Sequence, residues 1–347
     1  MSTRTVNTAQ IITGTAAGLA LLYFLRTILI PLVIAFVLAV LVNALVRWIQ
    51  RLWPRAPFWT VSILTGLIVI FLAAGGIFVM AQGAVQMVAQ GPALVSKLEQ
   101  IVQSTGRSMG LREPVHLTTI IGSVSIPEIA GSLLSGLQGL ASGVLLIIVY
   151  FGFILAGQQR IGRKIDAVAG ASESSRAVKD VVARIAADIR TYVWVQTVTG
   201  AILTASAALI MLIVGLHNVL FWSVIFFLLT FIPNIGVTVG SIAPSLFALI
   251  QFPTPWQALV IFGAIQIVAT VVGNLIYPRL QAETQNIDPV ATILSLAFWT
   301  FLWGLPGAFL AVPLTLMLMM VFAQFESTTW IAAMLSNDGK PRFRKKR

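Results

Sequence analysis

The chain has 347 residues, of which 58% are hydrophobic and only 10% are charged, and its mean hydropathy is +0.95. A soluble domain carries about 25% charged residues, so this composition excludes an ordinary soluble protein and indicates a chain that folds in lipid. The lack of cysteine excludes disulfides, thiolate metal sites and a cysteine nucleophile. The net charge is +11, but the basic residues flank apolar runs and form no single basic face, so we expect no nucleic-acid partner.

Apolar runs of helical character follow one another along the chain. A transmembrane helix needs roughly 20 apolar residues. The candidate spans are 11–25, 31–48, 58–81, 140–156, 192–214, 221–232, 256–277, 290–303 and 308–325. They predict an all-α, polytopic membrane helix bundle, with about eight spans plus two broken or re-entrant helical segments. Ten full spans is the alternative, and both versions place the two chain ends on the same side.

The polar segments between the runs divide the chain further. We expect N-terminal transmembrane helices over 1–81, an extracytoplasmic amphipathic segment over 82–139 and one transmembrane helix over 140–157. A cytoplasmic-side surface helix follows over 158–190, because apolar residues recur there at helical spacing between charged ones. The C-terminal transmembrane core, with its broken helices, spans 191–330, and a basic tail occupies 331–347.

The distribution of Lys and Arg predicts the orientation. Most of the 22 basic residues fall on one side if the N-terminus is cytoplasmic. Cytoplasmic loops of membrane proteins are enriched in Lys and Arg, so we expect both termini in the cytoplasm. The tail, with Lys340, Arg342 and Arg344 among its basic residues, is a candidate contact for anionic lipid headgroups.

Two apolar stretches carry helix-breaking residues. The stretch FIPNIGVTVGSIAPSLFALI, residues 231–250, contains Pro233, Asn234, Gly236, Gly240 and Pro244, and we expect breaks at both prolines. Unpaired backbone groups in hydrocarbon cost several kcal/mol each, so broken helices persist only against protein or water. These breaks therefore predict a discontinuous or re-entrant segment that lines a cavity.

A second stretch resembles the first. The sequence LWGLPGAFLAVPLTLMLMM, residues 302–320, contains Gly304, Pro306, Gly307 and Pro313. Paired interrupted segments point to the substrate site of a transporter. The alternative is a pair of ordinary proline-kinked spans, since Pro and Gly are frequent in membrane helices.

The run between the two broken stretches carries a polar stripe. Gln266, Thr270, Gly273, Asn274 and Tyr277 recur at spacings of three and four, which places them on one helix face. Polar groups facing lipid are unfavourable, so this face meets protein or a pore. A substrate path and hydrogen-bonded packing between helices both remain open at this point.

The acidic residues lie outside the apolar runs or at their edges. Glu283 and Asp288 are the candidates for ion coupling, but Asp288 precedes Pro289 and is also placed to cap the next helix. No HExxH, GxSxG or P-loop motif occurs. We therefore expect no enzyme activity, no metal and no cofactor.

The motifs in the C-terminal half together resemble a known family. They are IRTYVWVQT, FIPNIG, GNLIYPRL, NIDPV and FWTFLWGLPGAFLAVPLT, and their order and spacing over about 184–330 are similar to those of the autoinducer-2 exporter family. The resemblance implies a permease of the bacterial inner membrane that forms a homo-oligomer. Members of that family are assigned to export of the signalling molecule autoinducer-2 or to sodium–proton antiport.

Residues and resemblance together give three functional hypotheses. The first is a secondary carrier or facilitator for a small polar solute, with an autoinducer-2-like molecule as one candidate cargo. Asn234, Gln266 and Asn274 would offer it hydrogen bonds, and the two broken stretches would flank its path. The second is a sodium/proton antiporter that uses Glu283 or Asp288. The third is a membrane scaffold that transports nothing.

Overall fold

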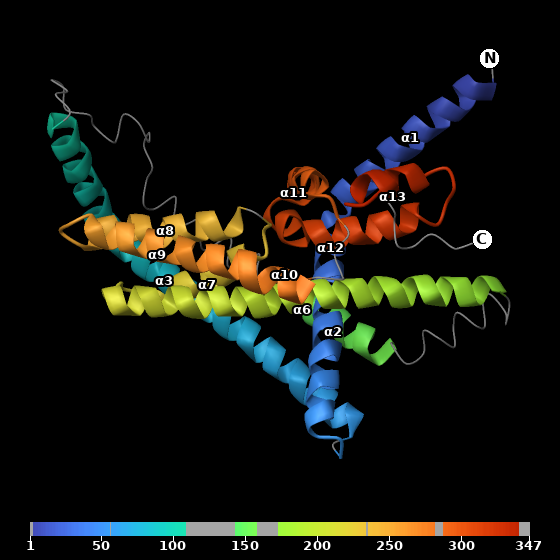
Figure 1. Ribbon diagram of the computed structural model, residues 1–347, viewed down its shortest axis with the longest axis horizontal. Coiled ribbons are helices and arrows are strands. Elements are labelled where there is room, and N and C mark those ends of the chain that lie inside the picture. Colours follow the sequence, from blue (N-terminus) through green and yellow to red (C-terminus); the bar gives the residue numbers. More distant parts are fainter. Residues whose placement is uncertain are drawn as a thin grey trace. The chain divides into compact units, whose positions relative to one another are not determined.

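The computed structural model describes residues 3–55, 57–108, 143–157, 173–233, 235–281 and 287–339. Throughout these ranges the regular elements are helices, separated by short turns (Figure 1). The helices are α1 (Thr3–Phe24), α2 (Arg26–Leu52), α3 (Phe58–Ser108), an unlabelled helix Gly143–Gly157, α6 (Glu173–Val214), α7 (Val219–Thr230), α8 (Gly236–Gln251), α9 (Trp256–Val271), the π-helical turn η1 (Val272–Ile276), α10 (Tyr277–Gln281), α11 (Pro289–Trp303), α12 (Leu305–Phe322) and α13 (Thr329–Leu335).

The helices confirm the predicted membrane bundle. Among the described residues, the helices long and apolar enough to cross a membrane are Arg26–Leu52, Thr60–Met87, Ala186–Val214, Trp256–Ile276 and Leu305–Phe322. The shorter apolar helices include α7, α8 and α11. At 1.5 Å per residue, the 12 residues of α7 reach about 18 Å, which is too short to cross a hydrocarbon core about 30 Å thick.

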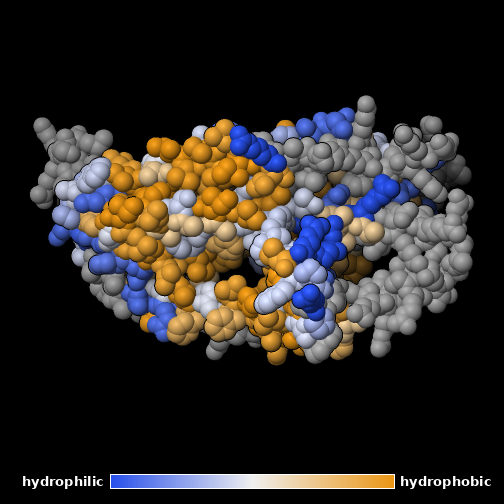
Figure 2. Space-filling view, turned by 60° about the horizontal axis from the view of Figure 1, so that its bottom comes forward, coloured by the Kyte–Doolittle hydropathy of each residue, from blue (hydrophilic) through white to orange (hydrophobic). Residues whose placement is uncertain are grey.

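The surface of the described residues is apolar over wide areas, as Figure 2 shows. Large side chains such as Phe71, Phe153 and Phe301 are at least three-quarters exposed. A soluble protein does not expose apolar area on this scale, because its contact with water is unfavourable. Lipid is the solvent in which this surface is stable.

Two helices run further than the sequence predicted. The span expected to end at residue 81 continues within α3 to Ser108, and the part of the expected surface helix from Glu173 onward forms one helix, α6, with the span after it; residues 158–172 of the expected surface helix lie outside the described residues. A change from apolar to polar residues determines whether lipid or water surrounds a helix, but it does not end the helix. Between Glu173 and Tyr192 the chain has no Gly or Pro, so nothing ends α6 there.

The chain forms two compact units. The first comprises Met1–Gly66, Val144–Gln196 and Gln281–Arg347, and the second comprises Leu67–Gly143 and Thr197–Leu280. In the first unit, Val40 of α2, Ile189 and Val193 of α6, and Leu316 and Met319 of α12 are buried in one cluster.

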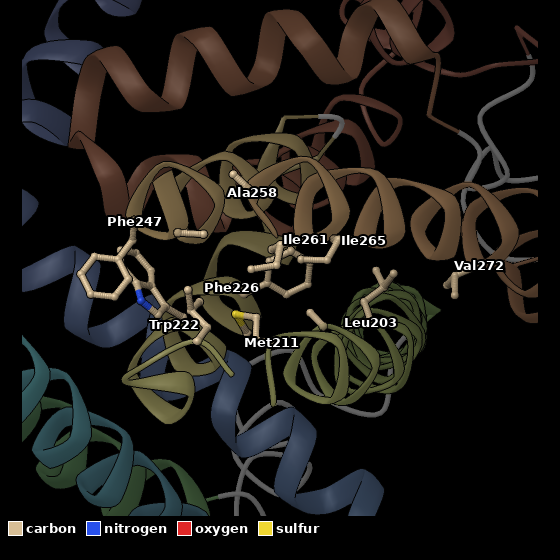
Figure 3. Packing of buried hydrophobic residues seen from close by; sticks show 12 residues of the cluster. Leu203, Met211, Trp222, Phe226, Phe247, Ala258, Ile261, Ile265 and Val272 are labelled. Carbon is tan, nitrogen blue, oxygen red and sulfur yellow. The ribbon is translucent and has the colours of Figure 1, made fainter. Parts of the chain in front are cut away.

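The core of the second unit joins α6, α7, α8 and α9. Figure 3 shows Met211, Trp222, Phe226, Phe247 and Ile261 pointing toward one another. The buried residues of α9 include Ala258, Ile261 and Ile265, at spacings of three and four. This periodicity turns one face of α9 inward and leaves the other face exposed.

Candidate functional site

The first broken stretch has one break, at the end of α7. The helix ends at Thr230, and α8 begins at Gly236. Short turns join them, with Phe231 N–H donating to Leu228 O and Ile232 N–H to Leu229 O, and Pro233 lies within this connection. Asn234 lies outside the described residues. The expected break next to Pro233 is therefore present.

The expected break at Pro244 is wrong, because α8 runs without interruption from Gly236 to Gln251 and buries Pro244. Proline is tolerated inside membrane helices where neighbouring groups compensate for the hydrogen bond it removes. Within α8 the hydroxyl of Ser241 donates to Thr238 O at 2.8 Å, and that of Ser245 donates to Ser241 O at 2.7 Å, so both hydroxyls find acceptors inside the helix, although neither bonds to Gly240 O, the acceptor that Pro244 cannot reach.

The glycines of this stretch allow α7 and α8 to approach each other closely. A Cβ atom at Gly236 would lie 1.7 Å from Leu229 O, and one at Gly240 would lie 2.8 Å from the ring of Phe226. Backbone atoms cannot yield as a flexible side chain can, so Gly236 is required by close packing. Its function in the structure is to close a helical hairpin.

The second broken stretch also has one break, at Gly304, between α11 and α12. Gly304 has φ 65° and ψ −144°, a conformation that glycine alone adopts readily. Pro306 then occupies the first turn of α12, where its missing N–H costs nothing. Pro313 is buried inside α12, which continues through it to Phe322.

Gly307 has the same function in this hairpin as Gly236 has in the other. A Cβ atom at Gly307 would lie 1.9 Å from Trp299 O and 2.6 Å from the carbonyl carbon of that residue. The indole N–H of Trp299 donates to Thr315 Oγ1 at 3.2 Å, and both side chains are buried. These contacts hold α11 against α12 within the first unit.

The polar stripe lies on the outer face of the second unit. Thr270, Gly273 and Asn274 are exposed, while Gln266 and Tyr277 are half-buried. The Thr270 hydroxyl donates to Gln266 O at 2.8 Å. Asn274 lies in η1, where Tyr277 N–H donates to Val272 O, five residues back. Such π-helical turns are rare and occur frequently at functional sites.

Sequence reasoning missed a set of buried polar atoms in the second unit. In the part of the chain that the structure describes, Thr204 Oγ1, Trp222 Nε1 and Ser223 Oγ are buried and have no hydrogen-bond partner. A buried polar group without a partner costs about 1–3 kcal/mol, so such atoms are rare in folded proteins. Ser, Thr and Trp are common in membrane helices, and no sequence signal distinguishes these three.

The two candidates for ion coupling have different outcomes. Asp288 caps α11: its Oδ1 accepts from Val290 N–H at 2.8 Å and from Ala291 N–H at 3.2 Å. Its own N–H donates to Leu335 O at 3.0 Å, which ties the start of α11 to the end of α13. Glu283 lies outside the described residues, as does the basic tail from Lys340 onward.

The predicted path residues belong to two units. Pro233, Gly236, Gly240, Pro244 and the polar stripe lie in the second unit, where α8 packs along α9. Gly304, Gly307, Pro313 and Asp288 lie in the first. Within the described ranges, no cluster of three His, Asp or Glu side chains could hold a metal ion.

Comparison with known proteins agrees with these features. The chain is 24% identical over 324 residues to the AI-2 transport protein TqsA of Escherichia coli (strain K12), covering 91% of this chain and 92% of that protein. It is 24% identical over 300 residues to YhhT of the same strain, with 83% and 82% covered. It is 25% identical over 314 residues to YueF of Bacillus subtilis (strain 168), with 84% and 82% covered.

A family model covers almost the whole chain. It is described as the AI-2E family transporter, and it matches residues 12–327. That range includes both helical hairpins, the polar stripe and the cap at Asp288. The match, together with the apolar helices, identifies the chain as a member of the AI-2E family of membrane transporters.

Proposed function

We propose that this transporter is a secondary carrier or facilitator that moves a small, uncharged polar solute past the polar stripe of its second unit. One observation carries the proposal. The stretch 219–276 contains no Asp, Glu, Lys, Arg or His, yet it exposes Thr270 and Asn274 among mostly apolar residues of α9 and η1.

The chemistry of these groups favours a neutral solute. The amide of Asn274 both donates and accepts hydrogen bonds, and the hydroxyl of Thr270 accepts further bonds while it donates to Gln266 O. Such groups match the hydroxyls of a polyol and demand no neutralisation of charge. Facing acyl chains, the Asn274 amide would meet no solvent partner, so a wet path or another protein surface is the environment that suits it.

The relative TqsA suggests the class of cargo. Its name assigns it to transport of AI-2, the autoinducer-2 signal, and it shares 24% identity with this chain. We propose a similar cargo for this protein, namely an autoinducer-2-like small molecule that is rich in hydroxyl groups. Asp288 gives no support to the sodium/proton alternative, because its carboxylate caps α11.

Flux through proteoliposomes tests this function. Purified full-length protein is reconstituted, and release of autoinducer-2 and of a panel of neutral polyols is measured with and without sodium and pH gradients. Asn274→Leu should lower the flux about fivefold or more, because it deletes a polar contact worth about 1 kcal/mol and adds apolar bulk. Ile267→Leu, at an exposed apolar position of the same helix, is the matched control and should leave flux unchanged.

The outcomes separate a path from a packing surface. Full flux through Asn274→Leu would remove the stripe from the transport path. If that variant also changed the oligomeric mass measured by light scattering, the stripe would be a contact between copies of the chain. An absence of solute release by the wild-type protein, under every gradient, would favour the scaffold hypothesis.

A further inference from the structure

A basic pocket lies between α2 and α6 in the first unit, and none of its lining residues belongs to either helical hairpin. Its volume is about 310 Å³, and no function assigned above uses it. This volume lies at the lower end of the range for small-molecule sites. The side chains that define the basic pocket are Arg47, Trp48, Arg51, Arg190, Thr191 and Trp194.

The helical repeat places these side chains together. Arg47, Trp48 and Arg51 follow one another on α2 at spacings of one and three, and Arg190, Thr191 and Trp194 repeat this pattern on α6. Residues three and four apart share a helix face, so each helix contributes one wall.

Buried residues of the same two helices fix the walls in place. Val42 and Val46 of α2 are fully buried, and Ile189 and Val193 of α6 lie in the core of the first unit. These apolar contacts orient the helices, so the guanidinium groups are directed to the pocket by packing. The packing therefore holds three positive charges close together against their mutual repulsion.

The charge of the basic pocket is strongly one-sided. Arg47 experiences the positive charges of both Arg51 and Arg190. Among the described residues, no carboxylate lines the pocket, and Asp188, the nearest acidic residue along α6, is not part of its wall. Like charges held together raise the free energy, and a bound anion lowers it.

The residue types select the kind of anion. The guanidinium group is a planar fork of N–H donors that matches the oxygens of a phosphate group in pairs. Trp48 is half-exposed and Trp194 is half-buried, and tryptophan side chains gather at the depth of lipid headgroups in membrane proteins. Basic pockets between membrane helices on the cytoplasmic side bind lipid phosphates.

We propose that the basic pocket binds the phosphate group of an anionic ligand. Two sources supply this chemistry: the headgroup of an anionic phospholipid and a soluble phosphate ester. Its lining residues are not those of the proposed solute path, so we assign it an anchoring or regulatory function in the first unit. Its basic residues are not those of the basic tail, since Arg47 belongs to α2 and Arg190 to α6.

Binding to the purified full-length protein in detergent tests both sources. Native mass spectrometry counts bound phosphatidylglycerol, with zwitterionic phosphatidylcholine as the lipid control. Calorimetry measures inorganic phosphate and glycerol 1-phosphate. Arg47→Gln and Arg190→Gln should each weaken binding about tenfold or more, because each removes a charge-assisted contact. Arg184→Gln removes the same charge from an exposed position of α6 outside the pocket, and it should bind as the wild type does.

The proposal is tested by which variants lose ligand binding. Phosphatidylglycerol binding that depends on Arg47 and Arg190 supports the lipid source, and phosphate binding with the same dependence supports the soluble source. The proposal is overturned if neither ligand binds, or if Arg184→Gln weakens binding as much as Arg47→Gln does. Arg47→Lys keeps the charge but loses the fork, so it gives an intermediate affinity and serves if the Gln variant misfolds.

Discussion

Replacing Gly307 by alanine should weaken the hairpin of α11 and α12. The new Cβ would lie 1.9 Å from Trp299 O, far inside the contact distance of the two atoms, and 3.1 Å from Trp303 Cβ. The clash involves the backbone of α11, so α12 has to move away as a whole. That movement also strains the hydrogen bond of Trp299 Nε1 to Thr315 Oγ1.

The expected loss in the free energy of unfolding lies at the upper end of the range for overpacked interiors. Insertion of a methyl group into a packed interior costs about 1–3 kcal/mol, and a rigid backbone neighbour leaves little room for relaxation. At about 2–4 °C per kcal/mol, a loss of about 3 kcal/mol lowers the melting temperature by about 6–12 °C. The helix propensity gained from Gly to Ala, about 0.5–1 kcal/mol, offsets only part of this.

Thermal unfolding of the detergent-solubilised protein measures the effect, followed by circular dichroism and tryptophan fluorescence. Gly152→Ala is the matched control, because a Cβ at Gly152 meets nothing within 4 Å and the residue lies in a helix of the same unit. It should melt at the wild-type temperature or slightly above. Equal melting temperatures for Gly307→Ala and Gly152→Ala would refute the close approach of α12 to Trp299.

Two further predictions concern Asp288 and the topology. Asp288→Ala should lower stability by about 1 kcal/mol through loss of the cap, while Asp288→Asn should retain most of it; a flattened pH dependence of sodium flux in the Asn variant would instead assign Asp288 to ion coupling. Because the chain has no native cysteine, single-cysteine variants report topology directly. In intact cells a membrane-impermeant maleimide should label Gln100→Cys but spare Arg55→Cys and Asp338→Cys until the cells are permeabilised; labelling of the last two in intact cells would contradict cytoplasmic termini.

The amino-acid sequence by itself predicted features that depend only on neighbouring residues. The cap at Asp288 follows from a short acidic residue before a proline, and the break near Pro233 from the N–H that proline lacks. Both depend on atoms a few residues apart. The apolar composition likewise determined that the chain folds as membrane helices, since burial in lipid depends on the residue types and not on their partners.

Tertiary structure alone decided where a helix tolerates proline and why particular glycines are needed. Pro244 and Pro313 are buried inside continuous helices, which residue type alone does not reveal. Gly307 is required because a Cβ atom at this position would lie 1.9 Å from Trp299 O. The basic pocket exists because packing brings Arg47 of α2 close to Arg190 of α6. Contacts of this kind depend on how helices distant in sequence pack, and no local pattern of residues encodes the distance between them.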